Sequence, residues 1–538
     1  MDRDSITVGE DDLTTPQNEK AQRPSHTSSD TIVAVLDDSI PHKDSPDSEP
    51  VVVLPTPYTV HTQGAKRLIV ASAAFSALFA SWTAQIYLPA LKIAADDLHT
   101  SVQKINLTVT SYMIFQGVSP IFIAGYADTS GRRPVYITCF ILYIAVNIAL
   151  ALSDSYGSLF AFRILQSATI SATQALCQGV VADVATSSER GQYTAFLALP
   201  VTLGPSIGPV IGGAIATYLG WRNIFWFLTI CAVINLGILF CFFPETCRTV
   251  VGDGSILPRK RNQTVRQLLQ NRKKKSGSDP ENTITITASL EAAAPKPASA
   301  WTRFRTSLLL LVEKELSLLF LYGGLLFAGV YAVATAVPSL FADIYGFDGL
   351  KIGLIYLPLA AGSIVSVVLT GKALNWNFQR HAKRLGLEVD KDRQMDLIDF
   401  PIEKARIEVV IPPLILSFVV ITAWGWALDT QVSIGIICVL VFLLGLGLVS
   451  VTSVFNALIA DIRPGKTGAA AAGNNIVKFL LSAAMSASIN PLIQATGPGK
   501  AYSIIATFYV LLSPLLYLVV RNGMKWRRQL RDKEGGRE

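Results

Sequence analysis

The chain contains few charged residues for its length. Asp, Glu, Lys and Arg make up 16% of its 538 residues, whereas apolar residues make up 51% and the mean hydropathy is +0.42. Typical soluble domains carry about a quarter charged residues. The composition therefore argues against a soluble protein and indicates a membrane protein.

Cysteines are also scarce, and the six present have neither the spacing of a disulfide framework nor that of a metal site. The polar segments contain no nucleophile elbow, phosphate loop or metal-ligand signature. We therefore expect no enzyme activity, no metal and no cofactor. The cysteines lie inside or beside apolar runs: Cys139, Cys177, Cys231, Cys241, Cys247 and Cys438.

Three polar segments interrupt or flank the apolar sequence. Residues 1–65 lack a basic stretch followed by an apolar core, so we expect a disordered cytoplasmic tail and not a cleaved signal peptide. Residues 246–305 contain the run RKRNQTVRQLLQNRKKK and have the composition of a cytoplasmic linker. Residues 521–538 form a basic tail.

Long apolar runs fill the remainder of the chain, each long enough to cross about 30 Å of hydrocarbon as a helix. They predict an all-α membrane protein with twelve transmembrane helices in two pseudo-symmetric six-helix bundles, at 66–245 and 306–520. The predicted spans are 66–91, 101–126, 134–153, 157–183, 190–219, 221–243, 315–342, 350–374, 408–428, 432–461, 466–495 and 498–520.

The distribution of Lys and Arg predicts the orientation of these spans. If the amino terminus is cytoplasmic, both tails and the even-numbered connections face the cytosol and hold most of the basic residues. We therefore expect both termini in the cytosol. The basic cluster at 259–275 could also suggest nucleic acid, but a loop facing lipid headgroups explains it more simply, and we expect no nucleic-acid partner.

A short internal repeat supports two related halves. The fourth span ends with Ala182-Asp183 and the tenth ends with Ala460-Asp461, each followed by a turn with basic residues. Equivalent positions in two halves are expected for repeats related by an axis along the membrane normal.

The connection between the second and third spans carries the first motif, Gly125-Tyr-Ala-Asp128-Thr-Ser-Gly131-Arg132-Arg133-Pro134. It resembles the loop signature of the major facilitator superfamily. The resemblance implies the corresponding twelve-helix fold and a cytoplasmic latch that holds one conformation closed. The latch consists of Gly125, Asp128, Gly131, Arg132, Arg133 and, as the expected partner of Asp128, Arg190. The second-half connection at 371–375 lacks the acid and the paired arginines.

The fifth span resembles the antiporter motif of the same superfamily, in which glycines stand four residues apart with embedded Gly-Pro. Glycines on one helix face allow close helix approach, and prolines bend the helix. We expect this segment to act as a pivot. The motif residues are Gly204, Pro205, Gly208, Pro209, Gly212 and Gly213.

The fourth span carries Arg163 and Gln166 in an apolar run, in a pattern similar to the fourth-helix motif of the superfamily, except that Ser167 replaces the usual glycine. In the family this arginine is linked to proton transfer. Since guanidinium stays charged, Arg163 is expected to tune a nearby acid or to bind an anion. Outward snorkelling of its side chain to the interface is the alternative.

Further short motifs resemble the twelve-span drug:proton antiporters, including the fungal quinidine-resistance and citrate-exporter branch. They are FFPETCR at the end of the sixth span, with Glu245, and IYLPAL at the end of the first, with Tyr87. The resemblance covers residues 66–520.

The eleventh span carries Lys478 about ten residues from its start, which places the amine near the bilayer midplane. An amine at that depth must face a watery cavity or a partner, because neither interface is within reach. It predicts a substrate cavity between the halves, with hydrogen bonding to helix carbonyls or Asn456 as the structural alternative. Other wall candidates are Asn474, Tyr112, Gln116, Gln85 and Tyr87.

Carboxylates are rare at depth, since Asp128, Asp183, Asp343 and Asp461 all lie at predicted span ends. No proton-carrying acid is therefore identified, and Lys478 could itself exchange protons or attract an anionic substrate.

We predict a monomeric transporter that exports a small organic molecule, driven by the proton gradient, in the plasma membrane rather than the vacuolar membrane. An importer or uniporter of the same fold, or a transporter-like receptor, are the alternatives.

Overall fold

The computed structural model describes residues 59–185, 193, 204–205, 207–254, 256, 258, 262–264, 305, 308–386, 400–462 and 467–535. This part of the chain is helical and contains ten stretches long and apolar enough to cross a membrane. The protein is therefore a multi-pass membrane protein. The predicted tail at 1–65 and linker at 246–305 lie mostly outside the described residues.

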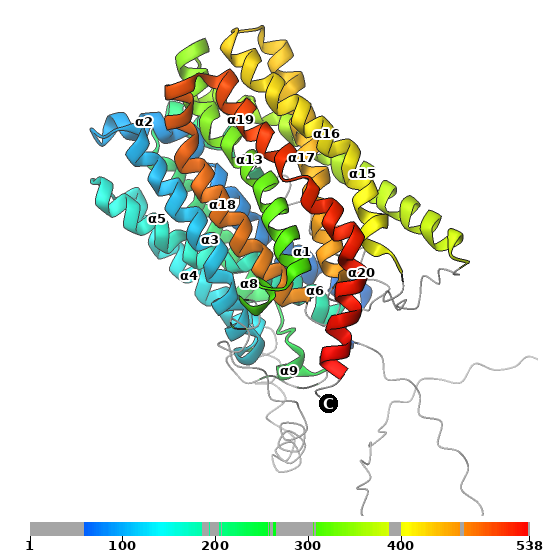
Figure 1. The fold of residues 1–538 in the computed structure, drawn as a ribbon. Helices are drawn as coiled ribbons and strands as arrows, with labels where there is room; N and C mark the ends of the chain where they lie inside the picture. The colour runs from blue at the N-terminus through cyan, green and yellow to red at the C-terminus, as the bar shows by residue number, and fades with distance from the viewer. Residues whose placement is uncertain are drawn as a thin grey trace, which may run out of the picture. The chain divides into compact units, whose positions relative to one another are not determined.

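In the first half, long helices occupy the predicted first, second, third and sixth spans, whereas the predicted fourth span, 157–183, is divided into two helices, α5 (Tyr156–Ile170) and α6 (Ala172–Val184) (Figure 1). The fifth predicted span is described mainly as a shorter apolar helix, Ile207–Tyr218. The other elements are α1 (Gln63–Gln85), η1 (Leu88–Ala90), α2 (Leu91–Asp97), α3 (Val102–Ser130), α4 (Arg132–Ala151), α8 (Arg222–Phe242) and α9 (Arg248–Val251).

The second half repeats this arrangement with longer helices. The predicted eighth span continues to Arg384, and the predicted basic tail at 521–538 continues the last helix as far as Gly535. The elements are α13 (Lys314–Tyr345), α14 (Gly349–Leu354), α15 (Tyr356–Arg384), α16 (Ile402–Asp429), α17 (Ile434–Ile462), α18 (Thr467–Thr496), α19 (Pro498–Leu511) and α20 (Pro514–Gly535).

Polar and glycine residues set the helix ends. Ser101 caps α3 by accepting a hydrogen bond from the backbone N–H of Lys104 at 3.3 Å, and Asp348 caps α14 in the same way at Lys351. Gly131, at φ +101°, separates α3 from α4, and Gly346 ends α13 in the left-handed conformation. These residues start or end helices and so divide the apolar sequence into separate spans.

Among the contacts between the halves, two depend on glycine. Figure 1 shows α3 and α18 side by side, and a Cβ on Gly117 would lie 3.0 Å from the Cβ of Phe479. The second contact joins the helix Ile207–Tyr218 to α14, where a Cβ on Gly213 would lie 2.1 Å from the carbonyl oxygen of Gly349. Small residues therefore permit close approach of the halves at both places.

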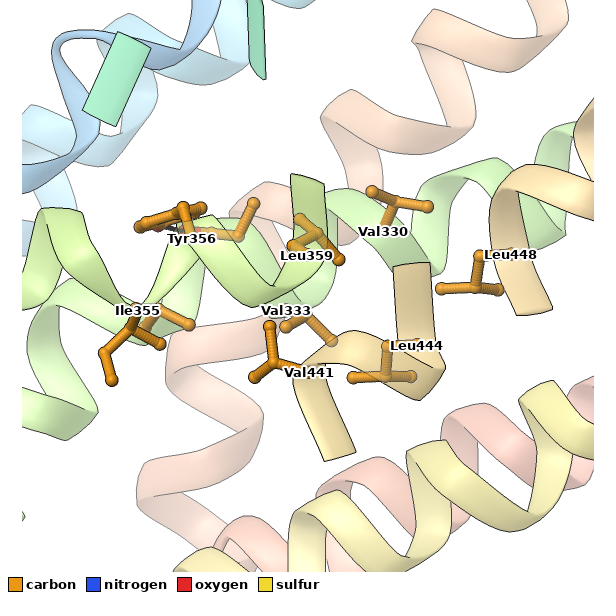
Figure 2. Close-up of a pocket in the computed structure, with 10 residues that line it drawn as sticks. Val330, Val333, Ile355, Tyr356, Leu359, Val441, Leu444 and Leu448 are labelled. Atoms are coloured by element: carbon orange, nitrogen blue, oxygen red, sulfur yellow. Dashed lines mark hydrogen bonds between the residues drawn. The ribbon is translucent and has the colours of Figure 1, made fainter. Parts of the chain in front are cut away.

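Within the second half, α13, α15 and α17 enclose a small apolar void of about 20 Å³ (Figure 2). Such a void has room for about one water molecule. Its lining is aliphatic except for Tyr356, whose hydroxyl already donates to the carbonyl oxygen of Ala334 at 2.6 Å. It is a packing gap and not a ligand site. Among its lining residues are Val330, Val333, Val441, Leu444 and Leu448.

Close packing of α15 on α17 generates a first prediction. A Cβ on Gly362 would lie 2.0 Å from the carbonyl oxygen of Phe442, whereas Gly371 on the same helix has nothing within 4 Å. We expect Gly362→Ala to lower the free energy of unfolding by about 1–3 kcal/mol through overpacking. Gly371→Ala is the matched control and should be neutral or slightly stabilising.

The measurement is the thermal unfolding midpoint of the purified protein in detergent. Equal midpoints for the two variants would contradict the packing described for α15 and α17.

Candidate functional site

The first half buries the cation Arg163 completely, with 0% of the residue exposed. Its guanidinium carbon lies 4.8 Å from the ring centroid of Tyr87 and 4.5 Å from that of Tyr112. Its NH1 donates to Oε1 of Gln166 at 2.5 Å, while Nε and NH2 have no hydrogen-bond partner among the residues that the structure describes. The side chain therefore points inward, and the snorkelling alternative is wrong.

A chain of buried amides continues from this arginine. Nε2 of Gln166 donates to Oδ1 of Asn147 at 2.7 Å, and Nδ2 of Asn147 donates to the carbonyl oxygen of Tyr143 at 2.7 Å. The sequence analysis did not identify Asn147. Its only signal is a single amide in the otherwise apolar span 134–153.

The second half holds the other cation, Lys478, on the side of α18 that faces α13. Its Nζ lies 4.2 Å from the ring centroid of Phe327 and 5.9 Å from that of Phe479. A Cβ on Gly324 of α13 would lie 3.4 Å from the Cα of Lys478. The amine therefore contacts α13 rather than pointing directly away from the bundle, and its side chain remains partly accessible.

Asn474 and Asn456, two of the cavity candidates, contact each other on α18 and α17. Nδ2 of Asn474, one turn before Lys478, donates to Oδ1 of Asn456 at 3.1 Å. Asn474 is buried and Asn456 is exposed. The alternative in which Asn456 bonds the lysine receives no support, because the hydrogen bond that Asn456 makes is to Asn474.

Neither cation has a carboxylate partner within the described ranges: the ion pairs there involve other residues, at the ends of the spans. Within the described residues, several other buried polar atoms of the first half also have no hydrogen-bond partner. Buried polar atoms are usually paired, so these imply contact with water or a ligand. They are Oε1 of Gln85, the hydroxyl of Tyr87, Oε1 of Gln116 and Nε1 of Trp82.

At the interface of the halves, α3, which carries Tyr112, packs against α18, which carries Lys478. Tyr331 of α13 interacts with Gln85 of the first half and packs 6.5 Å, ring to ring, from Phe479. Gly117 of α3, one turn from Met113, meets the same Phe479. Together these residues form the central polar cluster, which we define as Arg163, Gln166, Asn147, Tyr87, Tyr112, Gln85, Gln116, Tyr331, Phe327, Phe479, Lys478, Asn474 and Asn456.

The predicted latch forms a charged cluster at the end of the first bundle. NH2 of Arg132 lies 2.6 Å from Oδ1 of Asp128, and its Nε donates to Asp183 at 3.1 Å. Gly125 belongs to α3. Arg190 lies outside the described residues, so its contact with Asp128 stays a prediction.

Glu245 completes this cluster from the end of the sixth span. Oε1 accepts the backbone N–H groups of Arg132, Thr246 and Cys247 at 2.7–3.1 Å, and Oε2 accepts that of Arg133 at 3.3 Å. The carboxylate therefore caps the start of α4. Burial raises the pKa of Glu245 above its ordinary value, although the four backbone donors act in the opposite direction.

Glycine at position 131 is required by this geometry. Its φ of +101° is unfavourable for other residues, and a Cβ there would lie 2.3 Å from Oε2 of Glu245. Arg133 points away from the cluster and donates to the carbonyl oxygens of Phe240 and Phe243 at 2.7 and 2.9 Å. The motif thus ties α4 to both α3 and the segment after α8.

The second half has a counterpart, although the 371–375 connection lacks the motif. NH2 of Arg406 at the start of α16 lies 2.9 Å from Oδ2 of Asp461 at the end of α17. This pair corresponds to Arg132–Asp183, since both join the third helix of a half to the end of its fourth. The Ala-Asp repeat in the sequence therefore marks equivalent ion pairs.

The predicted pivot lies between two helices. Cβ atoms on Gly204, Gly208 and Gly212 would meet α1 and the segment that follows it, the last at 1.8 Å from the carbonyl oxygen of Ile86. A Cβ on Gly353 of α14 would lie 2.5 Å from the carbonyl oxygen of Pro209, on the other side. The glycines thus serve contact within the first half and, through Gly213, contact between the halves. Pro205 lies beside Gly204 in the described part of this segment.

Polar contacts join the halves at the end opposite Asp128. Nζ of Lys92 lies 2.9 Å from Oδ1 of Asp343, and Nε2 of Gln103 donates to Gln494 at 3.1 Å. Both pairs line a cavity of about 150 Å³ between the halves, which Asn106 also lines. Asn106 is buried, so the Asn106-Leu-Thr108 sequon is not an accessible glycosylation site.

These features define a multi-pass membrane protein with two related helical halves and a charged interior, the architecture of a solute transporter. A family model described as Major Facilitator Superfamily matches residues 73–389. The chain belongs to this superfamily, whose members are transporters and not enzymes.

Similar proteins support this assignment. MFS-type transporter phiD of Fungal sp. (strain ATCC 74256) is 41% identical over 89% of this chain and 71% of its own length. Citrate exporter 1 of Aspergillus niger is 32% identical over 89% of this chain and 91% of its own. The crystal structure of the human organic anion transporter MFSD10 (TETRAN) covers 84% of this chain and 99% of its own, with 18% identity and a TM-score of 0.50, and shows the fold alone.

The capping role of Glu245 generates a second prediction. Glu245→Ala leaves four buried backbone N–H groups without their acceptor and should lower the free energy of unfolding by about 1–3 kcal/mol. Glu245→Gln keeps one acceptor oxygen for most of these donors and should fall between wild type and alanine. Thermal unfolding in detergent measures both. Equal losses for Gln and Ala would argue against hydrogen bonding as the role of Glu245.

Proposed function

We propose that the protein exports a small organic anion and holds it between Arg163 of the first half and Lys478 of the second. The observation that carries this proposal is the presence of two interior cations without a described carboxylate partner. Ionised groups held away from water each cost several kcal/mol, and the charge of arginine cannot be removed by deprotonation.

The rings beside the cations offset only part of this cost. A cation over an aromatic face contributes about 2 kcal/mol when desolvated, and each cation here has such a face at 4.2–4.8 Å. Two N–H-bearing nitrogens of Arg163 have no hydrogen-bond partner within the described ranges. A carboxylate-bearing ligand supplies the missing acceptors and the opposite charge, which neutral and cationic solutes do not.

The name of one relative is consistent with this substrate class. Citrate exporter 1 aligns over 89% of the chain, and citrate is a small polycarboxylate. Citrate is therefore a suitable probe, whatever anion the cell supplies.

Export is proposed in exchange for protons, by a monomer in the plasma membrane with both termini in the cytosol. The direction follows the relative that is named an exporter, and the orientation follows the distribution of basic residues. The two halves would rock about the central polar cluster, with the segment from Gly204 to Gly213 as pivot and the Asp128–Arg132–Asp183 cluster as latch. Import or uniport of the same anion remains the second candidate, and the direction of flux separates them.

Transport in sealed membrane vesicles tests the proposal. In inside-out vesicles, an acidic interior should drive accumulation of radiolabelled citrate, and Lys478→Ala should reduce the initial rate at least about tenfold, since it removes one charged contact. Lys351→Ala is the matched control: Lys351 also lies over a ring, that of Phe347, but is exposed. It should transport normally.

Equal rates for the two lysine variants at equal membrane abundance would reject Lys478 as a substrate contact. Citrate accumulation that is unaffected by collapse of the pH gradient would reject proton exchange and favour uniport.

The ion pair between Lys92 of the first half and Asp343 of the second generates a further prediction. Lys92→Cys/Asp343→Cys replaces two residues that form an ion pair between the halves. A short bifunctional thiol crosslinker that joins the two cysteines should stop citrate transport reversibly, because alternating access requires these halves to separate. Full activity after complete crosslinking would show that the halves do not separate at this pair during transport.

A further inference from the structure

We infer that Gln166 and Asn147 are specificity-determining positions: their neutral amides fix the orientation of Arg163 while leaving its charge uncancelled for a substrate carboxylate. This inference rests on the proposed function and assigns the residues that set the charge of the site. It concerns atoms that are completely buried, since Asn147, Arg163 and Gln166 are each 0% exposed.

The direction of the amide chain is determined by its far end. The carbonyl oxygen of Tyr143 can only accept a hydrogen bond, so the group of Asn147 that lies 2.7 Å from it must be Nδ2. Oδ1 of Asn147 is then the atom that accepts from Nε2 of Gln166. Gln166 must in turn present Oε1 to NH1 of Arg163. The backbone carbonyl of Tyr143 thus fixes the orientation of two neutral amides, those of Asn147 and Gln166. As a result, Gln166 presents an acceptor oxygen to Arg163.

This arrangement holds one edge of the guanidinium and leaves the other available. NH1 is bonded to Gln166, whereas Nε and NH2 are buried and have no partner in the described part of the chain. The rings of Tyr87 and Tyr112 lie near the guanidinium and add no charge. The remaining donors are therefore suited to an incoming carboxylate, which binds guanidinium through two hydrogen bonds.

A carboxylate at position 166 would accept the same hydrogen bond but cancel the charge. A purely structural role and a charge-setting role therefore predict opposite results for two variants. If Gln166 only supports packing, Gln166→Glu should be the milder change, because Glu keeps the shape and an acceptor for Arg163. If Gln166 keeps the site positive, Gln166→Met should be milder for anion binding, because Met keeps the charge of Arg163 free.

The test uses the full-length protein purified in lipid nanodiscs, with citrate as the probe. The apparent Kd is taken from the rise in thermal unfolding midpoint as citrate is added. We expect Gln166→Glu to weaken citrate binding at least about tenfold, the effect of about 1.4 kcal/mol. Gln166→Met should weaken it less, although its unfolding midpoint without citrate falls below that of Gln166→Glu.

Asn147 provides a second variant. Asn147→Leu removes the group that orients Gln166, so Gln166 can rotate and present its NH2 group to Arg163. The loss of citrate affinity in Asn147→Leu should lie between the losses in Gln166→Met and Gln166→Glu. The double variant Asn147→Leu/Gln166→Met should bind citrate no more weakly than whichever of its two single variants binds more weakly, because both residues act through the same chain of hydrogen bonds.

The outcomes separate this inference from the proposed function. A wild-type protein whose midpoint does not respond to citrate overturns both. A citrate response that survives in Gln166→Glu, or that is lost more fully in Gln166→Met, overturns only the inference. Full additivity of the Asn147 and Gln166 losses would also overturn it.

Discussion

The positive charge that both halves hold in the interior of the protein is the constraint around which the central polar cluster is arranged. Arg163 stays ionised in any protein environment, so its buried charge needs stabilising contacts. The groups around it that provide these contacts are neutral: aromatic rings and an amide oxygen. Tyr87, in the segment between α1 and η1, and Tyr112 of α3 supply tyrosine rings. α5 supplies the acceptor oxygen of Gln166, and α4 orients that oxygen through Asn147. Polar positions on three apolar helices and on the segment after α1 are therefore explained by one charge.

The ends of the bundles obey a different rule, because there each charge has an opposite partner. Arg132–Asp183 and Arg406–Asp461 occupy equivalent places in the two halves. A second interaction connects the start of the third helix of each half to the sixth helix of that half or to the segment that follows the sixth helix. In the first half this is the carboxylate of Glu245 on the start of α4, and in the second it is Arg527 of α20 on Glu403 of α16, at 2.6 Å. The two interactions occupy equivalent positions in the two halves. The carboxylate, however, comes from the segment after the sixth helix in the first half (Glu245) and from the third helix in the second half (Glu403).

These interactions distinguish contacts within a half from contacts between halves. The charged partners within each half are mostly buried or half-buried. The pair that bridges the halves, Lys92–Asp343, has side chains 49% and 66% exposed. Exposed pairs contribute about 0–1 kcal/mol, so this one can break at small cost. The close glycine contacts at Gly117 and Gly213 add no polar bond that must be broken. Each half is thus suited to move as one body.

Much of the fold follows from the lengths of the apolar runs. The predicted span 432–461 corresponds to α17, Ile434–Ile462, because a helix in lipid has to satisfy its backbone internally over the full thickness. The break between α5 and α6 at Ser171 gave no such signal. Arg163 and Lys478 could be found from the sequence, since charges in apolar runs are rare. Phe327 could not, because a phenylalanine in an apolar helix looks the same whether it faces lipid or a cation. Glu245 was visible only as part of a motif, because its hydrogen bonds reach residues 112 and 113 positions away.

The position of the two cations on different halves bears on how an anion could drive motion. A ligand shifts a conformational equilibrium only by the difference between its affinities for the two states. An anion that touches only Arg163 would bind equally well whatever the second half does, and would shift nothing. One that reaches both Arg163 and Lys478 binds best at a single separation of the halves, because its carboxylates lie at fixed distances. Binding would then select that separation of the halves. The Lys92–Asp343 ion pair, which joins the halves, contributes little free energy and would oppose their movement only weakly. A substrate with at least two anionic groups is therefore the kind that this arrangement couples to movement most effectively.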